Sequence, residues 1–123
     1  MKKYSLSYDD EGDVLYVTFR QSERAVTQSL SPNIVLSYDR SLKQATGLTL
    51  IGFSEMIGVT TGQPVTLALD HLAELPDDKR RILLDMLIQP PVTDYLRIHD
   101  VGKSEVRVEV ISQPVLTGLL VPA

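Results

Sequence analysis

The densest group of side chains that could do chemistry lies near the N-terminus, in the segment "DDEGD". Its four carboxylates belong to Asp9, Asp10, Glu11 and Asp13. Carboxylates at this density could bind a divalent cation or form an acid–base pair. A calcium loop of the EF-hand type that starts at Asp9 needs glycine at its sixth position and a carboxylate at its twelfth. Those positions hold Val14 and Arg20. The segment therefore predicts a solvated turn that binds no metal.

The two histidines offer few catalytic arrangements. His71 and Glu74 are three positions apart on an expected helix and so share a face, but a metal site requires further ligands. His99 precedes Asp100, yet no serine lies in the G-x-S-x-G turn of a nucleophile elbow. The chain has no cysteine, which excludes thiolate sites and disulfides. We therefore predict no catalytic residue, no metal ligand and no cofactor.

The segment "VTDYLRIHD" is the best candidate for an interaction surface. In an extended strand its alternate residues project to one side; they are Thr93, Tyr95, Arg97 and His99. Tyrosine and arginine are enriched in protein interfaces, and the same side chains can stack on nucleotide bases. An ordinary solvent-exposed face remains an alternative for this strand.

The first half of the chain reads as short strands joined by turns. Tyr4, Leu6 and Tyr8 alternate with polar residues, as in a half-buried strand. We expect a three-residue loop that leaves Asp9 opposite Asp13 and gives Gly12 a positive φ. The next strand is apolar on both sides, which indicates cover on both faces.

The sequence "LSYD" occurs twice, at 6–9 and 36–39, and each copy is expected to close a strand and open a turn. Duplication and convergent hairpin chemistry are both compatible with so short a repeat. A strand near 25–30 would join the two hairpins into a meander that ends with a strand at 48–53.

A helix is expected from Asp77 to Gln89, because Pro76 and the following acids suit a helix start and "QPP" stops it. One narrow strip of this helix is polar: Asp78, Arg81, Asp85 and Gln89. Its remaining surface is apolar over an unusually wide arc. The sequence therefore predicts a homo-oligomer with Leu84 and Ile88 at the contact. The alternative is that other segments of the same chain cover the helix.

Further secondary structure is expected on both sides of this helix. A short helix is predicted at 67–75, and strands are predicted at 92–98, in "EVRVEVI" and in "VLTGLLV". The fold class is therefore α+β: an antiparallel β-meander packed against one or two helices, with further C-terminal strands. We expect 1–123 to form a single compact domain, with the meander at 4–56 and the helix plus C-terminal strands at 57–123.

The meander resembles a bacterial family, the domain of unknown function 2283, over residues 4–56. The opening of the family pattern is matched by Tyr8, Asp9, Gly12, Asp13, Leu15 and Tyr16. Its middle is matched by Asn33, Ile34, Val35, Leu36, Tyr38 and Asp39, and its end by Gly47, Leu48 and Ile51. The resemblance implies a small β-rich fold, supplies no catalytic residues, and suggests pairing with small toxin-like proteins.

The bulk composition narrows the functional classes. The net charge of −4 argues against nucleic acid and permits a basic protein partner. No apolar run is long enough to span a membrane, and the lack of cysteine fits the cytoplasm. We expect a non-enzymatic protein-binding or accessory module that forms homo-oligomers; an antitoxin-like partner that masks a basic protein is a special version of this expectation. The alternatives are a small-molecule binder or small enzyme with a pocket between sheet and helix, and a nucleic-acid binder.

Overall fold

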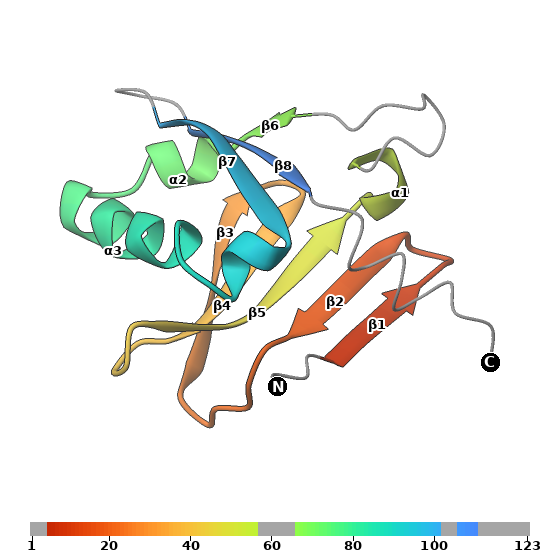
Figure 1. The fold of residues 1–123 in the computed structure, drawn as a ribbon, viewed down its shortest axis with the longest axis horizontal. Coiled ribbons are helices and arrows are strands. Elements are labelled where there is room, and N and C mark those ends of the chain that lie inside the picture. The colour runs from red at the N-terminus through yellow and green to blue at the C-terminus, as the bar shows by residue number, and fades with distance from the viewer. Residues whose placement is uncertain (1–4, 57–65, 102–105, 111–123) are drawn as a thin grey trace.

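The computed structural model describes residues 5–56, 66–101 and 106–110, which form two antiparallel sheets and a few short helices (Figure 1). The elements of the first half are β1 (Ser5–Asp9), β2 (Val14–Thr18), β3 (Ala25–Ser31), β4 (Ile34–Asp39), β5 (Gln44–Ile51) and α1 (Phe53–Met56). Those of the second half are β6 (Thr66–Ala68), α2 (Asp70–Ala73), α3 (Asp77–Leu87), the 3-10 helix η1 (Val92–Asp94), β7 (Leu96–Val101) and β8 (Val106–Val110). The prediction of an α+β fold with antiparallel strands is confirmed.

The five-stranded sheet has the strand order β1-β2-β5-β4-β3. Strands β3, β4 and β5 form a meander, but β2 pairs with β5 and β3 lies at the far edge. The predicted continuous meander is therefore wrong at the step from β2 to β3. The physical reason is that β5 is buried along most of its length, so its backbone groups need a partner strand on both sides. Strands β2 and β4 are those partners.

Strands β2 and β5 approach closely at Gly47. A Cβ atom at this position would lie 2.7 Å from the carbonyl oxygen of Val17, a separation that side-chain carbons do not tolerate. Glycine at this position therefore allows the central pair of the sheet to form.

The β1–β2 hairpin differs from its prediction by one residue. Asp9 pairs with Val14, so the loop has four residues, and the left-handed residue is Asp13 (φ 54°), whereas Gly12 has no positive φ. This register sets Leu15 opposite Tyr8, and Leu15 is fully buried on the inner face of the sheet. The predicted register and the predicted φ of Gly12 are wrong because the apolar inner face, and not the position of the glycine, determines the pairing.

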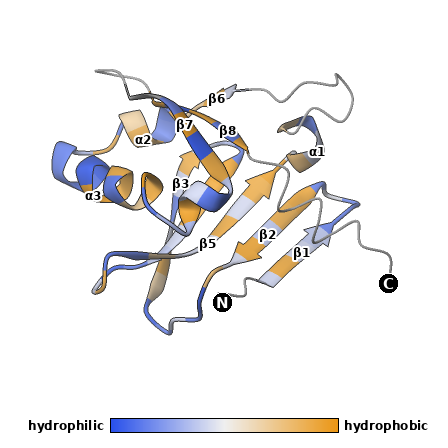
Figure 2. Ribbon diagram, viewed as in Figure 1, coloured by the Kyte–Doolittle hydropathy of each residue, from blue (hydrophilic) through white to orange (hydrophobic). Residues whose placement is uncertain are grey.

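The second half of the chain covers one face of the sheet on the side of β3, β4 and β5, and leaves β1 exposed (Figure 1). The three-stranded sheet has the order β6-β8-β7, and it lies with α2 and α3 over the strands of the first half (Figure 1). Buried side chains from both halves, from Leu15 to Val110, form one hydrophobic cluster. Figure 2 shows apolar residues concentrated along β2, β4 and β5, whereas the turn between β1 and β2 and the connection between β2 and β3 are hydrophilic.

The strands and the short helix predicted for the second half are confirmed in part. In β8 the residues Val106, Val108 and Val110 are buried at alternate positions, as predicted. The helix predicted at 67–75 is wrong in its first residues, because 66–68 pair with β8 and only Asp70–Ala73 are helical. The strand predicted in "VLTGLLV" lies outside the described residues.

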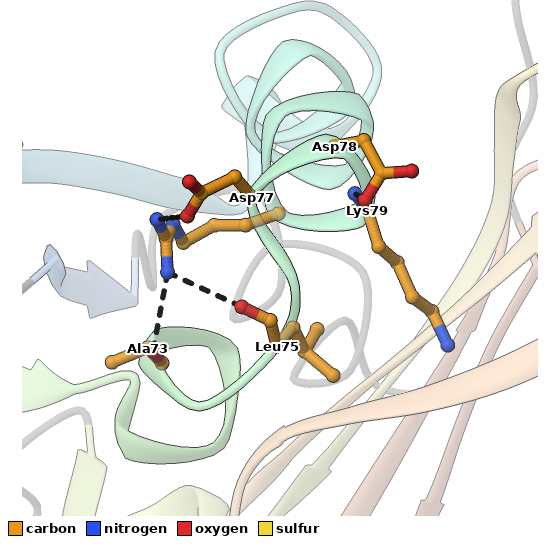
Figure 3. A network of polar contacts seen from close by, with 6 residues as sticks. Ala73, Leu75, Asp77, Asp78 and Lys79 are labelled. Carbon is orange, nitrogen blue, oxygen red and sulfur yellow. Dashed lines mark hydrogen bonds and ion pairs between the residues drawn. The ribbon is translucent and has the colours of Figure 1, made fainter.

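Helix α3 begins after Pro76 as predicted and ends at Leu87, two residues before the predicted end. Arg80 fixes the junction between α2 and α3. Its guanidinium donates hydrogen bonds to the carbonyl oxygens of Ala73 (3.2 Å) and Leu75 (3.3 Å) and forms an ion pair with Asp77 (Figure 3). These contacts satisfy one carbonyl at the end of α2 and one in the connection that follows it, and they hold the first turn of α3 beside them.

Candidate functional site

The predicted interaction face at residues 93–99 does not form as one strand. Thr93 lies in η1, and Tyr95 is only 4% exposed, with its ring 5.8 Å from that of Phe19. The chain stays in a turn conformation after the two prolines at 90–91. The backbone N–H of Thr93 donates to the carbonyl of Gln89, and the backbone N–H of Tyr95 donates to the carbonyl of Val92. The prediction of four residues on one extended face is therefore wrong.

The other two residues of that face lie on β7 and remain exposed. Arg97 is the cross-strand neighbour of Glu109, and the Nε2 atom of His99 lies 2.7 Å from a carboxylate oxygen of the same Glu109. A surface pair of this kind adds little stability. Whether Arg97 and His99 bind a partner stays a prediction.

His71 contacts a serine on a neighbouring strand. The Nδ1 atom of His71 lies 2.7 Å from the Oγ of Ser29, which also lies 2.9 Å from the carbonyl oxygen of Ser31. A carbonyl only accepts, so the single proton of the Ser29 hydroxyl points to Ser31. With the Ser29 hydroxyl donating to Ser31, the contact fits a hydrogen bond donated by the Nδ1–H tautomer of His71. The pair joins α2 to the edge strand β3.

The predicted oligomer contact on α3 is covered in part by the chain itself. Leu84 is half-buried and packs against the hydrophobic cluster, whereas Ile88 is 54% exposed. Leu83, Met86 and Leu87 are buried. Most of the wide apolar arc of α3 is therefore used inside the chain, and only Ile88 is left as a large exposed apolar side chain.

The acidic turn forms a hydrogen-bonded structure around Asp13. Its carboxylate accepts hydrogen bonds from the backbone N–H (3.0 Å) and hydroxyl (2.7 Å) of Ser54 and from the Tyr8 hydroxyl (2.6 Å). Burial raises the pKa of Asp13, but the hydrogen bonds from Tyr8 and Ser54 outweigh it, so the pKa lies below its usual value. The hydrogen bond to Asp13 raises the pKa of Tyr8 to about 12, together with burial and the neighbouring carboxylates. These contacts join the first hairpin to α1 and define a structural role.

A groove between the five-stranded sheet and α3 is the best candidate site. It has a volume of about 830 Å³ and is lined by Phe19, Arg20, Lys43, Gln44, Ala45, Ile82, Asp85, Met86, Gln89, Pro90 and Pro91. The groove brings together the end of β2, the β4–β5 loop and the last turns of α3. We call these residues the basic groove. Ala45 and Met86 are buried, and Phe19 and Ile82 are partly buried, so its floor is apolar.

The rim of the basic groove is mostly polar and carries two cations. The guanidinium of Arg20 donates a hydrogen bond to the side chain of Gln44, and both side chains are exposed. Within the described part of the chain, the Lys43 ammonium and the Asp85 carboxylate form no ion pair. The rim therefore has two cations and one opposing carboxylate.

The sequence contains no local signal for this groove. Arg20, Lys43 and Asp85 come from three segments far apart in the chain, and only the pairing of β2 with β5 brings the first two together. The general expectation of a pocket between sheet and helix agrees with the position of the groove, but no residue of the groove was predicted as a site.

A match with a known protein family covers the first hairpin and the strands β3 and β4 that follow it. Residues 6–41 match the family described as "Protein of unknown function (DUF2283)". The resemblance noted in the sequence is thereby confirmed over this segment. No curated protein and no solved structure matches the chain.

The residues that carry the DUF2283 pattern hold turns and fill the core. The Oδ1 atom of Asp39 accepts the backbone N–H groups of Ser41 (2.9 Å) and Leu42 (3.1 Å), and the side-chain amide of Asn33 donates to the carbonyl of Ile51 (3.0 Å). Leu36 is fully buried. The matched segment covers β1 to β4 but not the central strand β5, and it includes only Phe19 and Arg20 of the basic groove.

The described residues offer neither a metal cluster nor a membrane-spanning helix. In 5–56, 66–101 and 106–110, no three His, Asp or Glu side chains gather in a way that could hold a metal ion. His71 and Glu74 stand without a third ligand in this part of the chain. Over the same ranges, every helix is too short or too polar to cross a bilayer.

Proposed function

We propose that this protein is a non-enzymatic accessory module that holds an acidic segment of a partner protein in the basic groove. The observation that carries the proposal is the combination of an apolar floor and a cationic rim in one groove of about 830 Å³. Interfaces bind through apolar anchors in desolvated pockets, while charged rims orient the partner.

The floor of the groove suits an apolar anchor residue. Ile82 and Met86 from α3 face Phe19 and Ala45 from the sheet, and Pro91 lies beside them. Methionine adapts to partner side chains of different shape because it is unbranched and flexible. A leucine or phenylalanine of the partner would remove apolar surface from water there, at about 25 cal/mol per Å².

The rim favours a partner segment with carboxylates. The planar guanidinium of Arg20 on this rim can bind a carboxylate through two parallel hydrogen bonds. The β4–β5 loop adds Arg40 beside the exposed Leu42 and Lys43. This end of the sheet is basic although the whole chain has a net charge of −4.

A second candidate function is the binding of a small anionic molecule in the same groove. Its volume lies within the range of roughly 300–1,000 Å³ that is usual for small-molecule sites. The experiment below separates the two, because a peptide anchored by an apolar residue contacts the floor as well as the rim.

The proposal keeps two further expectations from the sequence. A basic, toxin-like protein partner would find carboxylates at the opposite end of the sheet, in the β1–β2 loop. A cytoplasmic location is proposed from the absence of cysteine. A nucleic-acid partner is less favoured because of the net charge.

The test is an NMR titration with a synthetic peptide in which a central leucine is flanked by three acidic residues on each side. We expect shift changes at Phe19, Ala45, Ile82 and Met86, and none with the matched peptide that carries lysines. Lys43→Glu should weaken binding about tenfold. Arg97→Glu makes the same charge change on β7 and should leave binding unchanged.

The control also decides where an interface lies. If Arg97→Glu abolishes binding and Lys43→Glu does not, the partner binds the three-stranded sheet and the proposal is wrong. If inorganic phosphate or citrate binds with shifts limited to the rim while the peptide does not bind, the small-anion function replaces it.

A further inference from the structure

The two ends of the five-stranded sheet carry opposite charges. The β1–β2 loop contributes Asp10 and Glu11, and no lysine or arginine belongs to this loop. At the other end, Arg20 and Arg24 lie in the β2–β3 connection with Glu23, and Arg40 and Lys43 lie in the β4–β5 loop. Figure 1 shows these loops at opposite ends of the strands.

The acidic loop has two carboxylates free to meet a partner. Asp9 accepts the N–H groups of Glu11 (3.2 Å) and Gly12 (3.3 Å), and Asp13 is bound to Tyr8 and Ser54. By contrast, the Asp10 and Glu11 side chains are exposed and accept no hydrogen bond from the described residues. These hydrogen bonds also hold the backbone of the loop, so little order is lost when it binds.

The basic groove offers the matching charges. Lys43 forms no ion pair with the described residues, and Arg20 contributes a second cation to the same rim. Two acidic side chains at the tip of a turn are comparable in size to the ligands that occupy grooves of this volume. Asp85 is the one carboxylate on the rim and would oppose them.

We infer that the acidic loop of one copy of this protein docks into the basic groove of a second copy. This inference rests on the cationic rim of the proposed function, since it names a second copy as the source of the carboxylates; the acidic loop has no apolar side chain to fill the floor. The contact joins two different surfaces, so it is heterologous and builds a ring or an open chain of subunits. It differs from the contact through Leu84 and Ile88 that the sequence predicts.

The charge on both surfaces can be exchanged, which gives a direct test. The groove variant is Arg20→Glu with Lys43→Glu, and the loop variant is Asp10→Lys with Glu11→Lys. By sedimentation velocity at low salt, we expect the wild-type mass to rise with concentration and to fall to 13.7 kDa at about 0.5 M NaCl. Each variant alone should remain at 13.7 kDa.

A mixture of the two variants should associate again, because each surface then meets its complement. A wild type that stays monomeric at low salt, or a mixture of variants that fails to associate, overturns the inference. Circular dichroism of each variant verifies that the substituted side chains have not unfolded the sheet.

Two further variants locate the contact. Asp85→Asn removes the opposing carboxylate and should strengthen association about threefold, whereas a contact elsewhere would not respond. If Leu84→Asp with Ile88→Asp dissociates the assembly and the charge variants do not, the contact lies on α3 and the inference is wrong. Binding of the acidic peptide without self-association would leave the proposed function standing and remove this inference alone.

Discussion

The two hairpins β1–β2 and β4–β5 share a local design and differ in what surrounds them. Each follows the sequence "LSYD" and has a four-residue loop. In each, the Oδ1 atom of the aspartate accepts the backbone N–H groups two and three positions later. The last loop residue is left-handed in both: Asp13 (φ 54°) and Lys43 (φ 53°). The repeated sequence therefore encodes a repeated turn.

The surroundings give the two turns different roles. Tyr8 is 37% exposed and Tyr38 6%, since β1 lies at the sheet edge and β4 between two strands. Asp39 is 5% exposed and also accepts the hydroxyl protons of Ser41 (2.7 Å) and Ser22 (2.8 Å). One local pattern thus forms an exposed acidic loop in one place and a buried anchor for the β2–β3 connection in the other.

The largest expected effect is that of Asp39→Ala. This change leaves two backbone N–H groups and two hydroxyls without their acceptor beside the core. We expect a clear fall in the urea midpoint, and a much smaller fall for Asp9→Ala at the matching exposed position. Equal effects of the two substitutions would show that burial does not distinguish the hairpins.

Asp13→Ala should destabilise the protein by about 2 kcal/mol, because hydrogen bonds to a charged acceptor are lost and alanine tolerates the left-handed region poorly. Urea unfolding measures this. Asp13→Asn is the matched control, since asparagine tolerates this backbone conformation, and it should cost less. If the asparagine variant costs as much as the alanine variant, the backbone conformation contributes little.

Stability should fall in acid through the buried aspartate. The hydrogen bonds from Ser41 and Ser22 lower the pKa of Asp39 from 3.8 to about 2. A depressed pKa contributes stability that is present above the unfolded-state value and is lost as the pH falls from about 4 to about 2. The urea midpoint of the wild type should drop across this window more steeply than that of Asp39→Asn. Parallel pH profiles would contradict the assignment.

Lys43→Gly should stabilise the second hairpin by about 1 kcal/mol, because glycine adopts a positive φ without strain. The side chain of Lys43 has no partner among the described residues, so no contact is lost there. The same substitution at Asp13 should destabilise, since the contacts of Asp13 to Ser54 and Tyr8 outweigh the strain. Thermal unfolding measures the change in stability of both variants. If both substitutions stabilise or both destabilise the protein, the two left-handed positions do not differ as predicted.

The addition of divalent metal ions is expected to have no effect on the acidic loop. The acidic loop should bind neither calcium nor magnesium at micromolar concentration, because Asp9 and Asp13 are already hydrogen-bonded and the loop lacks the ligand spacing of a calcium site. Isothermal calorimetry with both ions tests this. Binding that disappears in the double variant Asp9→Asn with Asp13→Asn would contradict it.

The predictions that held concern interactions within a few residues. The start of α3 after Pro76 and the alternation in β8 follow from local backbone chemistry and strand periodicity. The turn at "DDEGD" was also predicted, but the predicted strand register was wrong by one residue. The two registers differ only in which side chains of β2 face the core, and the local sequence does not decide between them. The helix predicted across 67–68 failed because those residues pair with β8.

What the sequence by itself determined about this protein is the set of turns, most of the strands, the main helix and the resemblance of the first hairpins to a family. These depend on neighbours in the chain, whose side chains and backbone groups act over a few ångströms. Only the tertiary structure decided that β2 pairs with β5, that Tyr95 packs against Phe19 and that Arg20, Lys43 and Asp85 share one groove. Those contacts join residues far apart in sequence. They depend on which apolar surfaces pack together when all the strands and helices form one core.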